Sequence, residues 1–322
     1  PSWIGEAAHQ AILAHKTRYT AVPGTLQLRQ AICQKFLNEN GLVYVPDEVI
    51  VSTGGKQVIF NAMMATLNPG DEVIIPGPYW VSYPDIVKLM DGVPVFVMCA
   101  PENGFKMTPQ MLEAAITPAT KWLILNAPSN PTGAVYTAAE LKALAAVLVR
   151  YPHVWILTDD IYEHISYLEE PYTTIAQAEP LLKSRTLTLN GVSKAYAMTG
   201  WRIGYAGGPQ ALINAMSMLQ SQSTSNPCSI AQEAALAALT GPQDFLTEVT
   251  AGFKQRRDYL VHSFNSLPGF DCDVPQGAFY LYVCCAGLIG KRTSSGGILQ
   301  TDEDVCTYLL DEFDVAVVPG KA

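Results

Sequence analysis

Charged residues make up only 15% of the 322-residue sequence, and basic ones are the scarcer kind, with 20 Lys and Arg against 29 Asp and Glu. The formal net charge of −9, with no offsetting basic stretch, argues against a nucleic acid or an anionic membrane surface as a partner. No apolar run approaches the length that spans a bilayer, and no charged segment followed by an apolar one opens the sequence. We therefore expect a cytoplasmic, globular protein whose ligands are small molecules.

Metal-binding and disulfide patterns are also missing. The seven cysteines form no C-x-x-C pair, and the adjacent Cys284 and Cys285 would point to opposite faces of a strand. We expect all seven to be reduced, mostly in the core, in a reducing compartment. The five histidines have no metal-ligand spacing, so we expect no metal site.

Short β-branched runs alternate along the chain with longer segments of helical periodicity. This alternation predicts an α/β fold, in which a mostly parallel sheet carries helices on both faces. Strands are expected at 49–51, 73–75, 93–97, 121–125, 154–158, 186–189 and 203–206. Helices are expected at 56–67, 108–116, 137–150 and 209–220, the second capped by Thr108 and the third opened by the capping box Thr137-x-x-Glu140.

The pattern changes near position 261. Beyond it we expect strands at 279–283 and 315–318, an exposed loop at 290–297 and a helix at 302–313. The interpretation is a large domain over 9–260 and a smaller α+β domain made of 1–8 and 261–322.

Polar or conformationally special residues follow five of the predicted strands. These segments are 53–56, 76–80, 126–131, 159–162 and 190–194. Each alone can be an ordinary connection between a strand and a helix. Because ligands of open parallel sheets bind at the carboxyl ends of the strands, the five together predict one site at one edge of the sheet.

The first of these segments suits a phosphate group. Gly54 and Gly55 let the backbone approach closely, and the N–H groups that open the helix at Lys56 offer hydrogen-bond donors at its positive end. Ser193 and Arg202 can complete an anion site, Arg202 through its planar guanidinium. A tight turn with a surface lysine, and a surface salt bridge for Arg202, are the structural alternatives.

Three further side chains suggest covalent and acid–base chemistry. Lys194 follows a strand in an apolar setting, and burial favours the neutral amine that Schiff-base formation needs, although a lysine there can simply be solvated. Asp159 follows an apolar strand, so its carboxylate should be partly buried and need a cation; a helix N-cap is the alternative. Tyr162 would lie on the same side of the following turn, unless it is a core residue.

Residues 193–205 (SKAYAMTGWRIGY) closely resemble the cofactor-attachment motif of the class I aminotransferases, enzymes that use pyridoxal 5′-phosphate (PLP) on the fold type I scaffold. The resemblance covers nearly the whole chain in order and is strongest to the bacterial aspartate aminotransferase branch. Further matching segments are 18–24 (RYTAVPG), 79–84 (YWVSYP), 126–133 (NAPSNPTG), 159–164 (DDIYEH) and 276–280 (QGAFY).

The resemblance implies roles around the cofactor ring. Lys194 would carry PLP as a Schiff base and then act as the general base and acid of the reaction. Asp159 would keep the pyridine nitrogen protonated, which makes the ring an electron sink. Tyr162 and Asn130 would hydrogen-bond the phenolic oxygen, and Trp80 would stack on the ring. Trp80 and Asn130 are also expected to contact the substrate.

The resemblance also implies a phosphate site and a dimer. Gly55, Lys56, Ser193 and Arg202 would surround the phosphate, while Lys56 can instead face the side-chain carboxylate of an acidic substrate. Tyr19 would reach the phosphate of a neighbouring subunit, which implies a homodimer with shared active sites.

The function that follows is transfer of an amino group from aspartate, or a related amino acid, to 2-oxoglutarate by a ping-pong mechanism. Aspartate/prephenate or aromatic aminotransferases of the same branch, a PLP lyase or decarboxylase and a non-catalytic PLP-binding fragment are the alternatives. Relative to the family, the sequence begins after an N-terminal arm and ends before the strand whose arginine clamps the substrate α-carboxylate. We therefore expect the smaller domain to be incomplete at both ends.

Overall fold

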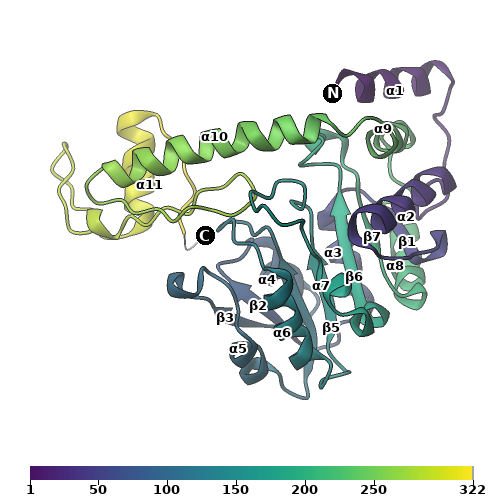
Figure 1. Ribbon diagram of the computed structural model, residues 1–322, viewed down its shortest axis with the longest axis horizontal. Coiled ribbons are helices and arrows are strands. Elements are labelled where there is room, and N and C mark those ends of the chain that lie inside the picture. Colours follow the sequence, from purple (N-terminus) through teal and green to yellow (C-terminus); the bar gives the residue numbers. More distant parts are fainter. Residues whose placement is uncertain (321–322) are drawn as a thin grey trace.

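A computed structural model describes residues 1–320 of the chain, and its centre is one mixed β-sheet (Figure 1). Its strands are β1 (Val49–Ser52), β2 (Glu72–Gly77), β3 (Val93–Met98), β4 (Thr120–Asn126), β5 (Trp155–Asp159), β6 (Thr186–Gly191) and β7 (Gly204–Gly207). The helices are α1 (Ser2–Leu13), α2 (Leu26–Asn40), α3 (Gly55–Thr66), α4 (Ser82–Leu89), α5 (Pro109–Ala115), α6 (Ala138–Leu148), α7 (Ile175–Ala178), α8 (Gln210–Gln222), α9 (Ser229–Thr240), α10 (Phe245–Ser266) and α11 (Asp302–Phe313).

The strand order in the sheet is β1-β7-β6-β5-β4-β2-β3. Strands β3, β2, β4, β5 and β6 pair in parallel, and β7 is antiparallel to both β6 and β1. Since Ser52 and Gly191 both pair with Gly204, the carboxyl ends of β1 and β6 flank the start of β7. The predicted α/β class and the mostly parallel sheet are confirmed.

Helices cover both faces of the sheet, which explains why every residue of β1 and β6 is buried. Along β1 the side chains alternate between two cores. Ile50 lies in a cluster with α3 and α8, whereas Val49 and Val51 lie in a cluster with α2 and α9. The alternation follows the two-residue repeat of an extended strand.

Local signals correctly placed several helix starts. Thr137 accepts a hydrogen bond from the Glu140 backbone while the Glu140 carboxylate accepts one from the Thr137 backbone, so the predicted capping box opens α6. The Thr108 hydroxyl caps α5 by accepting a hydrogen bond from the backbone N–H of Met111, the third residue of that helix. Each such cap satisfies a backbone N–H that the helix leaves without a partner.

The C-terminal quarter differs from the prediction in two places. No strand forms at 279–283 or at 315–318 within the described residues, so both predicted strands are wrong, whereas the helix at 302–313 and the loop at 290–297 are confirmed. A β-branched or aromatic run becomes a strand only where a neighbour completes the ladder. The first run is flanked by two isolated bridges, Ser166 with Gly277 before it and Asp271 with Cys284 after it, and neither extends into a ladder.

Helix α10 runs from beside α9 to the region of α11, and the following segment returns along it toward the sheet (Figure 1). The helix crosses position 260, where the sequence suggested a domain boundary, and the division into two domains stays a prediction. Positions 321–322 of the predicted smaller domain lie outside the described residues. In the described part of the chain, no helix has the length and apolarity to cross a membrane.

Candidate active site

The ends of β4 and β5 bring two of the predicted segments together. Asn126 and Asp159 are register partners at the last position of the two strands. The Asn126 side-chain amide donates to the Asp159 backbone carbonyl at 2.9 Å, and its oxygen accepts from the Asn130 backbone N–H at 2.8 Å. One asparagine therefore fixes the segment that carries Asn130 against the segment that carries Asp159.

Asp159 is a buried acid with neutral hydrogen-bond partners. The Tyr83 hydroxyl donates to one carboxylate oxygen at 2.8 Å, and the Ile161 backbone N–H donates to the other at 3.4 Å. Burial raises the pKa of Asp159 to about 6, and these two donors and the Lys194 charge offset only part of that rise. The sequence predicted partial burial, whereas the structure buries the Asp159 side chain almost completely, and the carboxylate is suited to receive a cation.

Trp80 packs against Tyr83, the residue whose hydroxyl donates to this acid. Its ring meets the Tyr83 ring edge to face, with 5.4 Å between centroids, and Lys56 Nζ lies 4.7 Å from the Trp80 ring. The Tyr79–Trp80 pair precedes α4, and Lys56 belongs to the first turn of α3. Asn130 lines a small cavity at the same edge together with Tyr83 and Asn126. The structure thus brings Lys56, Trp80, Asn130 and Asp159 to one side of the sheet.

Lys194 follows β6 and is half-buried between aromatic rings. Its Nζ lies 5.5 Å from the centroid of the Tyr162 ring and 5.6 Å from that of Phe279. Burial lowers the pKa of Lys194; the Asp159 charge opposes this effect and the Arg202 charge adds to it. A lowered pKa increases the share of neutral amine, the form that attacks a carbonyl carbon.

Tyr162 is almost fully buried, and its hydroxyl lies 2.6 Å from the hydroxyl of Tyr280. Burial raises the pKa of Tyr162, and Tyr280 raises it further. Tyr280 reaches the site because the backbone of Gly277 and Ala278 is hydrogen-bonded to Gly133 and to Ile165, next to the segment that carries Tyr162.

Two functional contacts were not predicted from the sequence. Tyr83 and Tyr280 both lie in segments that carry the family resemblance, but no role was assigned to either. The signal that could have indicated Tyr83 is the need of buried Asp159 for a donor. No comparable signal exists for Tyr280, since it lies 118 positions from Tyr162.

The predicted phosphate segment forms a close-packed cradle. Gly54 has φ +83, and a Cβ there would lie 2.3 Å from Nη2 of Arg202. A Cβ on Gly204 would lie 2.2 Å from the Gly55 backbone nitrogen, so strand β7 presses against the start of α3. The Arg202 side chain, exposed to solvent, also donates to the Thr199 carbonyl at 3.1 Å. A guanidinium thus lies beside the N-terminus of α3, and Ser193 is buried just before Lys194.

Tyr19 does not join the buried part of this site in the single chain. It lies between α1 and α2, and its side chain is 89% exposed. Its predicted role toward a neighbouring subunit stays a prediction.

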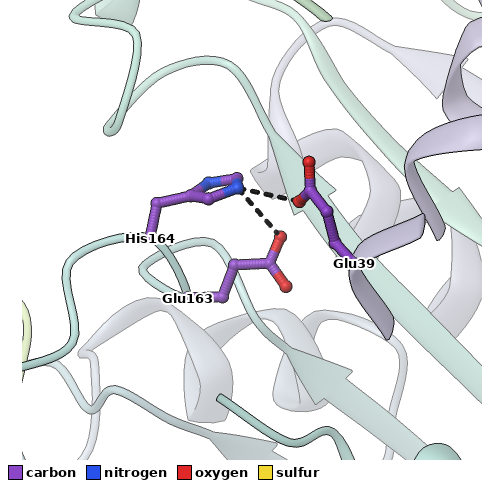
Figure 2. Close-up of side chains that lie close together, drawn as sticks. All are labelled: Glu39, Glu163 and His164. Atoms are coloured by element: carbon purple, nitrogen blue, oxygen red, sulfur yellow. Dashed lines mark hydrogen bonds and ion pairs between the residues drawn. The ribbon is translucent and has the colours of Figure 1, made fainter. Parts of the chain in front are cut away.

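A cluster of Glu39, Glu163 and His164 supports the segment that carries Tyr162 (Figure 2). His164 Nε2 lies 2.8 Å from a Glu39 carboxylate oxygen and 3.8 Å from Glu163. The residue types are those of metal ligands, but the cation between these carboxylates is the buried Lys35, which contacts Glu163 and lies 3.4 Å from Glu39. The ion pair anchors the β5–α7 connection to α2.

Comparison with known proteins gives consistent results. A sequence model of the family described as "Aminotransferase class I and II" matches residues 1–322. The aspartate aminotransferase of Rhizobium meliloti (strain 1021) is 58% identical over 322 residues, which are 100% of this chain and 78% of that protein. An aspartate/prephenate aminotransferase of Cereibacter sphaeroides is 59% identical over 322 residues, 100% of this chain and 80% of that protein.

Solved structures agree with the sequence relatives. The crystal structure of the aspartate aminotransferase from Rhizobium meliloti matches with a TM-score of 0.97 and 58% identity, covering 100% of this chain and 80% of that one. The aspartate aminotransferase from Thermus thermophilus with maleate matches with a TM-score of 0.91 and 43% identity, with the same coverage. With the family matched over its whole length, the chain belongs to the class I and II aminotransferases.

Proposed function

We propose that this aminotransferase binds PLP at the carboxyl edge of the sheet, attached to Lys194, and transfers an amino group from aspartate to 2-oxoglutarate by a ping-pong mechanism. The main support is that a half-buried lysine amine lies within reach of the charge of a buried acid, Asp159. The hydrogen-bond donors to Asp159 are neutral groups. The identities to proteins named aspartate aminotransferase support the choice of donor.

The residues present fit this cofactor at three points. Asp159 offers a buried negative charge for a protonated ring nitrogen, and an opposite charge at contact shifts a pKa by about 1–3 units. Trp80 offers an aromatic ring next to Tyr83, the donor to that acid, and Tyr162 offers a hydroxyl on a ring whose centroid lies 5.5 Å from Lys194 Nζ. The glycine-lined start of α3, next to Arg202, offers backbone N–H groups and a guanidinium to a phosphate.

When bound, PLP supplies an electron sink for the charge that develops at the substrate Cα. Lys194 Nζ would be the group that accepts the Cα proton, once the substrate amine has taken its place on the cofactor, and burial favours the neutral amine that this requires by lowering its pKa. Asp159 would hold the proton on the ring nitrogen. Tyr162 and Asn130 would bind the phenolic oxygen, and Ser193 would join Arg202 at the phosphate.

Lys56 is proposed to select acidic substrates. Its ammonium lies over the Trp80 ring, on the exposed side of the site, where it can meet either the phosphate or the side-chain carboxylate of aspartate. The relative named as an aspartate/prephenate aminotransferase makes a prephenate-accepting enzyme of the same branch the second candidate.

We also propose a homodimer in the cytoplasm. An exposed Tyr19 is available to reach the phosphate of a second copy. The seven cysteines are free thiols, as suits a reducing compartment.

The test is the absorbance spectrum of the purified chain with PLP, before and after addition of aspartate. We expect a band of covalently attached cofactor near ~360–430 nm that is missing in Lys194→Ala. Aspartate should shift the band toward the amine form of the cofactor and yield oxaloacetate, and 2-oxoglutarate should restore it. Alanine as the product would indicate a decarboxylase. A band that does not change when aspartate is added would indicate a protein that binds PLP without catalysis. An unchanged band in Lys194→Ala would refute the attachment site.

A further inference from the structure

Asp160, the neighbour of Asp159, lies in a separate hydrogen-bonded group. Its side chain is buried, and its Oδ1 accepts from the Thr158 hydroxyl. The same oxygen lies 2.8 Å from the Tyr172 hydroxyl, which lies 2.9 Å from the carbonyl oxygen of Ala127. Tyr172 therefore bridges the end of β5 and the segment between Asn126 and Asn130.

The number of protons in this bridge depends on the charge of Asp160. Tyr172 has one hydroxyl proton, and an ionised Asp160 would be an acceptor like Ala127, so only one of the two hydrogen bonds could form. The other carboxylate oxygen, Oδ2, is buried with no hydrogen-bond partner among the described residues, and the same holds for the Thr174 hydroxyl oxygen. Burying an anion in this way is costly.

A protonated Asp160 removes the conflict. Its O–H donates to the Tyr172 oxygen, and the Tyr172 O–H then donates to the Ala127 carbonyl. Both short contacts become hydrogen bonds, and the oxygen left without a partner belongs to a neutral acid.

The surroundings of Asp160 favour its neutral form. Burial raises the pKa of Asp160 to about 7, and the charge of Glu163 adds to the rise, whereas the hydrogen bonds from Thr158 and Tyr172 to its Oδ1 offset part of it. Lys35, the buried cation that could offset the charge of Glu163, is held in an ion pair with Glu163 itself. The other titratable side chains that interact with Asp160 are the phenols Tyr44, Tyr83 and Tyr172.

We propose that Asp160 is a neutral carboxylic acid in the folded protein at pH 6 and a positioning residue, which in this form holds the Ala127 carbonyl through Tyr172 and leaves Asp159 as the anion of the pair. The proposal rests on the proposed function to the extent that the segment fixed at Ala127 carries Asn130 of the cofactor site. Asp160 itself contacts neither Asn130 nor Asp159 through any hydrogen bond of its side chain.

The first test is infrared difference spectroscopy of the PLP-saturated protein. At pH 6, wild type minus Asp160→Asn should show the carbonyl band of a protonated carboxylic acid, and the band should vanish at pH 9. Wild type minus Asp258→Asn, a matched change at an exposed acid, should show no such band. A difference spectrum for Asp160 that contains only carboxylate bands at pH 6 would overturn the proposal.

A second variant covers the case in which Asp160→Asn does not fold. Tyr172→Phe removes the acceptor of the Asp160 proton, so the carbonyl band should move to higher frequency; an unchanged carboxyl region would contradict the proposal.

The pH dependence of cofactor binding gives a separate readout. Ionisation of Asp160 breaks one of the two hydrogen bonds of Tyr172, which position the segment at Ala127. The Kd for PLP should therefore rise between pH 6 and pH 9 in the wild type, and this rise should be about fivefold larger than the rise in Asp160→Asn. Equal pH profiles would count against the positioning role. A wild type that binds no PLP would refute the proposed function instead, and the infrared test can then be read on the unloaded protein.

Discussion

Asp159→Asn should stabilise the unloaded protein at alkaline pH while it damages the cofactor site. The Asp159 carboxyl is buried with neutral donors, Tyr83 and Ile161, and its pKa rises from 3.8 to about 6. A rise of about 2 pKa units corresponds to roughly 3 kcal/mol of unfavourable free energy once Asp159 ionises. The ionised Asp159 therefore lowers the stability of the folded protein, and it provides a buried anion for the cofactor.

The sign of the pH effect follows from the raised pKa. The folded state binds more protons than the unfolded state between the two pKa values, so the stability that Asp159 contributes is fully present below about pH 4 and is lost as the pH rises through about 6. Asparagine does not titrate. The unfolding free energy of Asp159→Asn relative to wild type should therefore increase by about 1–1.5 kcal/mol between pH 5 and pH 8.

Urea denaturation of the unloaded wild type and Asp159→Asn at both pH values measures this difference, with exposed Asp258→Asn as the control. In the PLP-loaded variant, loss of a buried charge partner should lower kcat/KM for aspartate at least about a hundredfold, since breaking such a pair costs about 3–5 kcal/mol. A variant that keeps the wild-type pH dependence of stability, or that keeps full activity, would contradict the charge assigned to Asp159.

Three further changes test other parts of the site. Gly54→Ala should lower stability by about 1–3 kcal/mol in thermal unfolding and weaken PLP binding, because its φ of +83 is strained for alanine and the new Cβ would meet Arg202. Lys56→Met should raise KM for aspartate about tenfold or more while leaving PLP attachment intact; loss of the attached cofactor would instead place Lys56 at the phosphate. Lys35→Met should lower the free energy of unfolding, measured by urea denaturation, by about 3–5 kcal/mol, because Glu163 is left buried without its cation. The double variant with Glu163→Gln should recover part of that loss. An equally unstable double variant would show that the ion pair is not the cause.

The sheet and the edge that carries the site could be predicted because they depend on local patterns. Alternating β-branched and helical segments fixed the order of elements, and the rule for parallel sheets placed Asp159 and Lys194 at the same edge. The buried environment of Asp159 followed from the apolar strand before it. These are short-range properties of the chain.

The partners of these residues could not be predicted in the same way. Tyr83 donates to Asp159 across 76 positions, and Tyr280 meets Tyr162 across 118 positions. Such contacts depend on how helices and loops pack in three dimensions. The strand expected at 279–283 failed for the same reason, because aromatic residues there pack around Lys194 and Tyr162 instead of joining a ladder.

Lys194 is proposed to hold the cofactor, and chemical reduction can make this attachment permanent so that its position in the chain can be identified. The PLP-loaded protein is treated with borohydride, which reduces the carbon–nitrogen bond between cofactor and lysine, and the labelled peptide is identified by mass spectrometry. We predict that the label is on Lys194 and that Lys194→Ala carries none. A label on Lys56, or on Lys35, or an unlabelled wild type, would contradict the proposed active site.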